Sequence, residues 1–252
     1  MSSPQPDLRR TLGAAARLWA GSGRHEVDED GWLALSGAPN VNYNLACCLS
    51  AGPDVLSDRY LQPVLDLGRP GIVMLGGPGL ATAQKLVEAG WVSVGALPLM
   101  ILEAAAAGAP PADPGPRPLS LEELPLARQL LADTYGLDDA SAVAAVPDRA
   151  AEDEDLAVWG LFDGDQLVAS VTIAVEDGLA VVWSMATRPE CQGRGYGRRL
   201  LEMVLRHHFD RGATGSLLHS SVAGERLYRG LGYAVVDYLQ LWSRPRWVLG
   251  FA

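Results

Sequence analysis

A glycine-rich segment, Gln-Gly-Arg-Gly-Tyr-Gly at residues 192–197, restricts the possible folds of this chain more than any other feature. It lies between an expected strand and an expected helix. Three glycines within five residues allow positive φ angles and a close approach of the backbone to a ligand. The first N–H groups of the helix have no acceptor within it, and the positive end of its dipole lies behind them. The segment therefore predicts an anion site at a strand–helix junction.

The local charge favours a polyphosphate as that anion. Residues 188–211 contain six arginines and three carboxylates, a net charge of +3 in a chain of −10. A Walker loop is excluded because it needs Gly-Lys before Ser or Thr, and the only lysine is Lys85. A dinucleotide fingerprint needs Gly-x-Gly-x-x-Gly after the first strand of a βαβ unit, whereas these glycines follow an antiparallel meander with a shorter spacing.

The hydrophobic pattern of the C-terminal half predicts a mixed α/β sheet. Ser120 and Glu123 have the spacing of a capping box for a helix that ends near Thr134. The expected order is helix, antiparallel meander, helix, strand, helix, strand. The predicted elements are strands Leu156–Phe162, Gln166–Val175, Leu179–Ala186, Thr214–His219 and Tyr233–Ser243, and helices 195–211 and 223–231.

Residues 104–118 are small and proline-rich, which predicts a linker between two domains. We expect domains at 1–108 and 116–252, joined by a Pro/Ala-rich linker at 109–115. An offset of 142 residues aligns the two halves without gaps and places Gly90 on Gly232. The N-terminal half is therefore expected to repeat the order strand, helix, strand, helix, strand.

The chain resembles the GNAT superfamily of N-acetyltransferases around the glycine-rich segment. The main family motif is Gln/Arg-x-x-Gly-x-Gly/Ala, which Gln192, Gly195 and Gly197 match. Two further features, Arg188-Pro-Glu before the motif and Leu227–Tyr233 after it, match in order and spacing. The resemblance covers residues 116–245 and extends to the N-terminal half only through the internal repeat. It implies two tandem GNAT-like domains, of which the first is degenerate and lacks the CoA loop.

The resemblance also implies that acetyl-CoA is bound as the acyl donor. The pantetheine arm is expected beside the end of the third meander strand, and the pyrophosphate on the amides of residues 192–198. The implied cofactor-binding residues are Met185, Ala186, Thr187, Gln192, Gly193, Arg194, Gly195, Tyr196, Gly197, Arg198 and Ser221. Ser221 stands where many family members have an asparagine.

Tyr228 is the catalytic candidate, at the position that often protonates the departing CoA thiolate. An unperturbed pKa near ~10 keeps a tyrosine protonated at neutral pH. The alternative role is a core aromatic, because Tyr228 lies next to the apolar stripe of Leu227 and Leu231. No general base is visible, and we expect water in that role. His219 ends a strand that faces the expected cleft, but a single histidine is more often structural.

The N-terminal half lacks these features. Gly77 and Gly79 resemble a dinucleotide loop, but its third glycine is replaced by Thr82, so a turn is expected. By the same offset, Gly52-Pro-Asp-Val55 is the counterpart of Arg194–Gly197, and Leu86 is the counterpart of Tyr228. Proline removes an amide donor, and Asp54 adds a negative charge where phosphates would lie.

The composition limits the setting and the partners. The 252 residues are 48% hydrophobic and 20% charged, which is ordinary globular composition. The net charge of −10 disfavours nucleic acid and anionic membranes as partners. Three cysteines, two of them adjacent, are a poor basis for disulfides, and no stretch is long and apolar enough for a membrane span. We therefore expect a cytoplasmic protein without a metal, whose oligomeric state is open.

Two main hypotheses of function follow. The first is an N-acetyltransferase that moves an acetyl or other short acyl group from acyl-CoA to a primary amine by direct transfer. The second is a CoA-binding sensor or scaffold without catalysis. An aminoacyl-transferring relative is a more distant alternative, because such proteins usually lack the CoA loop. Tyr228 favours the enzyme, and the acceptor amine is not specified by the sequence.

Overall fold

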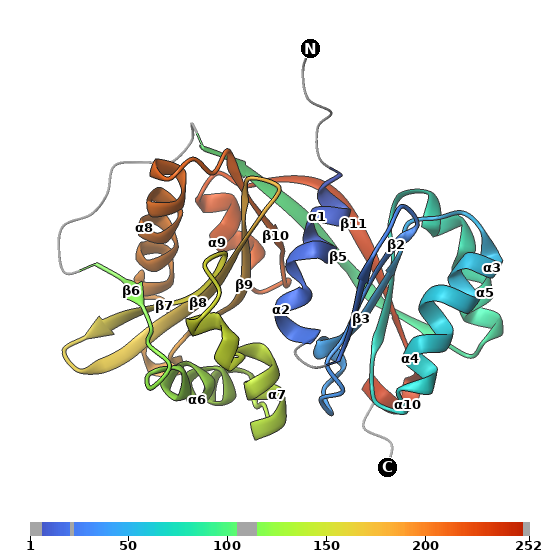
Figure 1. Cartoon of the computed structure of the whole chain (residues 1–252), viewed down its shortest axis with the longest axis horizontal. Helices are drawn as coiled ribbons and strands as arrows, with labels where there is room; N and C mark the ends of the chain where they lie inside the picture. Colours follow the sequence, from blue (N-terminus) through green and yellow to red (C-terminus); the bar gives the residue numbers. More distant parts are fainter. Residues whose placement is uncertain (1–6, 21–22, 105–114, 249–252) are drawn as a thin grey trace. The chain divides into compact units, whose positions relative to one another are not determined.

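The computed structural model describes residues 7–20, 23–104 and 115–248 (Figure 1). Their contacts group the chain into two compact units. Unit 1 comprises Met1–Leu99 and Val236–Ala252, and unit 2 comprises Met100–Val235. The strands β5 (Val92–Glu103) and β11 (Ala234–Ser243) each contribute residues to both units. The predicted linker, except for Gly115, lies outside the described residues, and the domain bounds stay a prediction.

Unit 2 is a mixed α/β sheet with helices. Its strand order is β5-β10-β9-β8-β7-β6, in which β9 and β10 are parallel and β6 to β9 are antiparallel. Besides the end of β5 and the start of β11, its elements are β6 (Arg117–Pro118), α6 (Leu124–Tyr135), α7 (Asp139–Ala145), β7 (Leu156–Asp163), β8 (Gln166–Glu176), β9 (Leu179–Thr187), α8 (Tyr196–Asp210), β10 (Gly215–His219) and α9 (Glu225–Gly230).

The predicted order of helix, meander, helix, strand, helix, strand is confirmed in unit 2, with boundaries that agree within two residues for the strands. The capping box forms only in part. The carboxylate of Glu123 accepts from the amide of Ser120, but the Ser120 hydroxyl donates to Glu122 and caps no helix N–H. Helix α6 accordingly begins one residue after Glu123, and α7 was not expected from the sequence.

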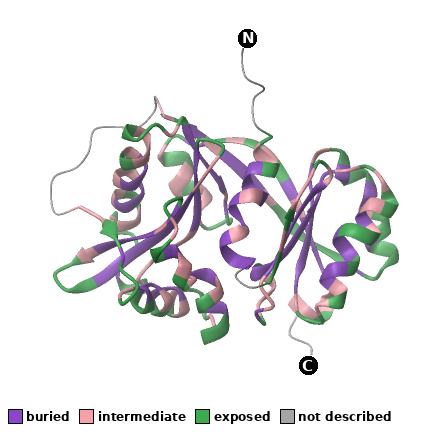
Figure 2. Ribbon diagram, in the orientation of Figure 1, coloured by how far each residue is buried: buried purple, intermediate pink, exposed green. Residues whose placement is uncertain are grey.

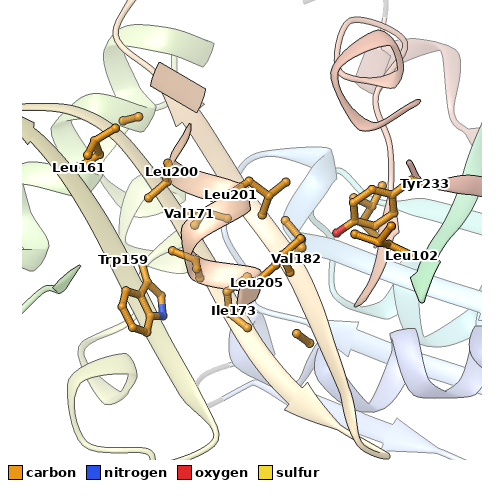
Figure 3. Packing of buried hydrophobic residues seen from close by; sticks show 14 of the residues in the cluster. Leu102, Trp159, Leu161, Val171, Ile173, Val182, Leu200, Leu201, Leu205 and Tyr233 are labelled. Carbon is orange, nitrogen blue, oxygen red and sulfur yellow. The ribbon is translucent and has the colours of Figure 1, made fainter. Parts of the chain in front are cut away.

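The core of unit 2 lies where α8 packs on the meander. Leu200, Leu201 and Leu205 of α8 are buried in one cluster with Val171 and Ile173 of β8 and with Val182 of β9 (Figure 3). Met100 and Leu102 of β5 are buried in the same cluster. Their inclusion shows that β5, which precedes the predicted linker, completes the core of unit 2.

In unit 1 the strand order is β1-β2-β3-β4-β11. Strands β3 and β4 are parallel, and the remaining pairs are antiparallel. Besides its parts of β5 and β11, its elements are α1 (Leu8–Ala15), α2 (Arg17–Ala20), β1 (Arg24–Val27), β2 (Gly31–Leu35), β3 (Asn44–Cys48), α3 (Pro53–Val55), the π-helical turn Leu56–Leu61, α4 (Gln62–Asp66), β4 (Ile72–Leu75), α5 (Ala83–Glu88) and α10 (Pro245–Val248).

Strands β2, β3 and β4 of unit 1 are buried along their whole length (Figure 2). Its core is built around Leu33, Leu56, Leu75 and the edge-to-face pair of Trp91 and Trp247, whose ring centroids are 5.5 Å apart. Among the described helices, none combines the length and apolar character needed to cross a membrane. All three cysteines are buried and free.

The two halves of the chain share one order of elements: three strands, a helical segment, a strand, a helix and a strand. Helices α5 and α9 begin 142 residues apart, at Ala83 and Glu225, as the sequence offset predicts. The helices after the third strand are capped by Gly52 and Gly195, which are one residue further apart than that offset. The shared order supports a duplication, which remains a proposal.

Candidate functional site

The parallel strands β9 and β10 of unit 2 are paired over only part of their length. The register runs from Leu179 opposite Gly215 to Val182 opposite Leu218. Strand β9 continues to Thr187, so its last five residues have no β10 partner. A bulge lies at this point: Ser184 has a φ of 45°, and the β8–β9 register shifts between Ser170 and Thr172. The end of β9 therefore presents a backbone edge away from β8.

The hydrogen bonds identify which β9 residues form this edge. The amide of Arg188 donates to Val168 O at 2.9 Å, and Ala186 pairs with Ser170, so these residues face β8. Neighbouring residues in an antiparallel strand alternate in direction. Met185 and Thr187 accordingly face away from β8. Thr187 O accepts from Nε2 of Gln192 at 3.1 Å, and Met185 O accepts from the hydroxyl of Tyr135.

The glycine-rich loop joins β9 to α8, and after Gln192 its backbone amides donate to no acceptor in the described part of the chain. The first amide bonded into the helix is that of Arg199, which donates to Gly195 O at 2.9 Å. Within the described residues, the N–H groups of residues 193–198 have no hydrogen-bond acceptor. The Gly195 N-cap has no side chain to satisfy them. Six consecutive donors at the positive end of a fifteen-residue helix can bind an anion.

The three glycines of the loop serve different purposes. Gly193 and Gly195 have φ angles of 74° and 86°, and a Cβ added at either position would meet nothing within 4 Å. These two residues are glycine because of their left-handed conformation. Gly197 has no such φ, but a Cβ there would lie 2.9 Å from Oγ1 of Thr187. It allows the first turn of α8 to lie directly against the end of β9.

The charged and polar side chains of the loop divide into two groups. Arg194 is exposed and makes no ion pair or side-chain hydrogen bond with the described part of the chain. Arg198 binds Glu202 Oε1 at 2.9 Å and Gly230 O at 3.0 Å, which ties α8 to α9. Gln192 uses its amide on Pro189 O and its side chain on Thr187 O. Tyr196 donates to Asp163 at 2.6 Å, and this bond raises the pKa of its phenol.

Tyr228 lies on α9 with its hydroxyl 3.7 Å from Sδ of Met185. Burial, and then the nearby Tyr135, raise the pKa of the Tyr228 phenol, so the protonated form is favoured. Its ring is held edge-on by Tyr233, with the ring centroids 5.7 Å apart. The Tyr233 hydroxyl is hydrogen-bonded to Ser216 Oγ at 2.6 Å, deep in the core. Tyr228 therefore carries a proton donor that is fixed beside the edge of β9.

Ser221 and His219 lie at the turn between β10 and α9. Ser221 Oγ accepts from the amide of Gly224 at 3.2 Å, and Ser221 O accepts from Glu225, so this serine organises the start of α9. His219 is the last residue of β10 and is partly buried. In the described residues, no three His, Cys, Asp or Glu side chains are grouped so that they could hold a metal ion.

A comparison with protein families identifies this part of the chain. The family model "Acetyltransferase (GNAT) family" matches residues 124–233, which run from the start of α6 to the residue before β11. The match includes the edge of β9, the glycine-rich loop and Tyr228. Residues 124–233 belong to the GNAT family. The predicted family is thereby confirmed for the C-terminal half.

Solved structures share the fold of this chain over most of its length. A GCN5-related N-acetyltransferase from Kribbella flavida is 22% identical, with a TM-score of 0.65 over 92% of this chain and 95% of that chain. A putative GNAT acetyltransferase from Novosphingobium aromaticivorans is 20% identical, with a TM-score of 0.58 over 96% and 99%. A GCN5-related N-acetyltransferase from Sphaerobacter thermophilus is 14% identical, with a TM-score of 0.58 over 87% and 81%.

These likenesses extend beyond residues 124–233 and therefore include the fold of unit 1. The predicted fold class, a mixed α/β sheet with helices, is confirmed, and the GNAT-fold structures cover most of the chain. That the N-terminal half is a degenerate GNAT-like domain stays a prediction. A comparison with curated proteins found no match.

One residue beside the edge of the GNAT domain was not predicted from the sequence. Tyr135 ends α6, fifty residues before its hydrogen-bond partner Met185. The only sequence signal is an aromatic residue immediately before Gly136, which ends the helix with a φ of 66°. The remaining candidates lie together in unit 2: the edge residues, the loop and Tyr228.

The corresponding region of unit 1 has a different geometry. Strands β3 and β4 stay paired to their last residues, with Cys48 opposite Leu75, and the next amide, Gly76, donates to Cys48 O. Helix α3 begins with Pro53 and has Asp54 in its first turn. Between β3 and β4, the described part of unit 1 thus lacks the unpaired strand edge that the GNAT domain presents.

Proposed function

We propose that unit 2 is an acyl-CoA-dependent N-acyltransferase that transfers an acetyl or other short acyl group to a primary amine. One observation carries the proposal: six unused amides at the start of α8 lie next to a strand edge with no partner, and Gly197 joins the two. The first feature suits a pyrophosphate, and the second suits an extended arm with amide groups. Acyl-CoA combines both, and membership of the GNAT family supports this donor.

The phosphates are proposed to bind to the amides of residues 193–198. The exposed guanidinium of Arg194 adds a positive charge that no described carboxylate neutralises. The side chains of Gln192, Tyr196 and Arg198 already have partners, so we propose that they shape the loop and contribute through its backbone. The pantetheine arm is proposed to run along the edge at Met185, Ala186 and Thr187, with Ser221 at the opposite strand end.

Tyr228 is proposed to donate a proton to the leaving sulfur. In direct transfer the amine nitrogen attacks the thioester carbon, the C–N bond forms, and the C–S bond breaks. The thiolate takes the phenolic proton, the amine releases its proton to water, and a proton from water restores the Tyr228 phenol. The raised pKa of Tyr228 keeps that proton in place at neutral pH. The proposal needs no metal and no covalent enzyme intermediate.

The three free and buried cysteines support a reducing compartment, and we propose the cytoplasm. The net charge of −10 supports an acceptor other than nucleic acid.

The test is a titration of the purified protein with acetyl-CoA, competed by CoA, followed by a screen of primary amines in which released thiol is measured. Saturable, competitive binding and amine-dependent thiol release are expected. Binding without release for any amine would favour a CoA sensor, and no binding would contradict the proposal.

A further inference from the structure

Tyr135 links the end of α6 to the edge of β9. Its side chain is 56% exposed, yet its hydroxyl donates to the backbone carbonyl of Met185. The neighbouring Thr134 reaches the same strand end, where its hydroxyl oxygen lies 3.5 Å from Thr187 O. Gly136 then ends the helix, so Tyr135 is the last helical residue and its position is set by α6.

Met185 is contacted by two tyrosine hydroxyls. Tyr135 binds its carbonyl oxygen, and Tyr228 lies against its Sδ. After burial, Tyr135 is the second cause of the raised pKa of Tyr228, so the two phenols are electrostatic neighbours. The proposed proton donor and Tyr135 therefore flank the same residue.

On the side away from β8, no described strand pairs with Met185 and fixes its orientation. Met185 directly follows the bulge at Ser184, and the pairing of β9 with β10 has ended at Val182. In an extended strand the N–H and C=O of one residue point to the same side. The hydrogen bond from Tyr135 to Met185 O therefore also sets the direction of the Met185 N–H.

We propose that Tyr135 is a positioning residue for acyl transfer: by holding Met185 O, it aims the Met185 N–H at the carbonyl oxygen of the bound thioester. Negative charge develops on that oxygen when the amine attacks, and a fixed backbone donor stabilises it. The inference rests on the proposed function. It concerns the acyl end of the donor, since the phosphates are assigned to the start of α8 and the pantetheine arm, which CoA shares, to the edge that includes Met185.

Because acetyl-CoA and CoA differ only in the acyl group, the proposal can be tested by binding, without an acceptor. Wild type, Tyr135→Phe and Tyr238→Phe are titrated separately with acetyl-CoA and CoA. Tyr238 is the matched control, since it is 50% exposed and its hydroxyl has no partner within the described residues. Tyr135→Phe should weaken acetyl-CoA binding about threefold to tenfold, the effect of losing one hydrogen bond, and weaken CoA binding clearly less. Tyr238→Phe should change neither.

Once an acceptor is found, Tyr135→Phe should lower kcat and leave the KM for the amine unchanged. An unchanged ratio of acetyl-CoA to CoA affinity in Tyr135→Phe overturns the inference, and so does an equal loss for both ligands, which indicates a structural role. Failure of the wild type to bind either ligand is a different result, because it contradicts the proposed function itself.

Discussion

Gly197 and Thr187 are in direct contact: a Cβ added to Gly197 would lie 2.9 Å from Oγ1 of Thr187. Real Cβ atoms are essentially never found closer than about this distance, so the pair fixes how near α8 can come to β9. The contact brings the unused amides of the loop next to the unpaired edge of β9. Glycine at this position is therefore needed for packing, whereas Gly195 is needed for its backbone conformation.

Gly197→Ala is expected to destabilise the protein by about 1–3 kcal/mol, because it overpacks the contact with Thr187. Thr187→Ala in the same chain should restore most of that loss. Gly230→Ala is the control, since its Cβ would meet only the flexible end of Arg198 at 3.4 Å. Urea unfolding of the four proteins measures the effect. If Gly197→Ala lowers the free energy of unfolding equally with and without Thr187→Ala, the assigned contact is contradicted.

Gly195→Val is expected to weaken acetyl-CoA binding by about tenfold or more, because a branched side chain at a φ of 86° disturbs the loop where phosphates are proposed to bind. Gly37→Val is a close control: its φ is 80°, and its Cβ would also meet nothing within 4 Å. Both variants should lose stability to a similar extent. Calorimetry should show that only Gly195→Val loses affinity, and the same affinity in both variants would remove the loop from the site.

Tyr228→Phe is expected to slow turnover by about 10²-fold to 10⁴-fold, the usual contribution of a general acid, and to leave CoA affinity unchanged. Equal rates would remove Tyr228 from the mechanism.

The pH dependence follows from the raised pKa of Tyr228. The folded protein favours the protonated phenol, so its contribution to stability is complete below the ordinary tyrosine value of about 10 and is lost as the pH rises above it. The wild-type rate should therefore show no loss of the acid between neutral pH and about pH 10. A decline centred well below that value would assign the proton to another group.

The elements of unit 2 were predictable because their signals are local. The turns between the meander strands occur at Asp177-Gly178 and at Gly164, all with positive φ, and the strands between them are buried and apolar. The glycine-rich loop was predictable for the same reason, since conformation at Gly193 and Gly195 depends on neighbours in the chain.

Features that depend on distant contacts were not predictable. The repeat gives the order of the strands but not which strand pairs with which, so the sequence did not indicate that Met100 and Leu102 enter the core of unit 2. The bond from Tyr135 to Met185 joins residues fifty positions apart, and no periodicity marks it. Ser120 had the right spacing for a cap, but its hydroxyl binds Glu122 instead.

Each chain is expected to bind one CoA, in unit 2 alone. In unit 1, β3 and β4 remain paired up to Cys48 and Leu75, which leaves no edge for a pantetheine arm. Pro53 at the start of α3 has no N–H to offer a phosphate, and Asp54 repels one.

The stoichiometry of an acetyl-CoA titration checks this expectation. It should be near ~1 per chain, and Gly195→Val should remove that single site without revealing a weaker one. Pro53→Ala with Asp54→Ala should restore no binding in unit 1, because the closed strand pair remains. Two equivalent sites in the wild type would contradict this expectation. They would show that unit 1 binds CoA despite its closed strand pair, Pro53 and Asp54.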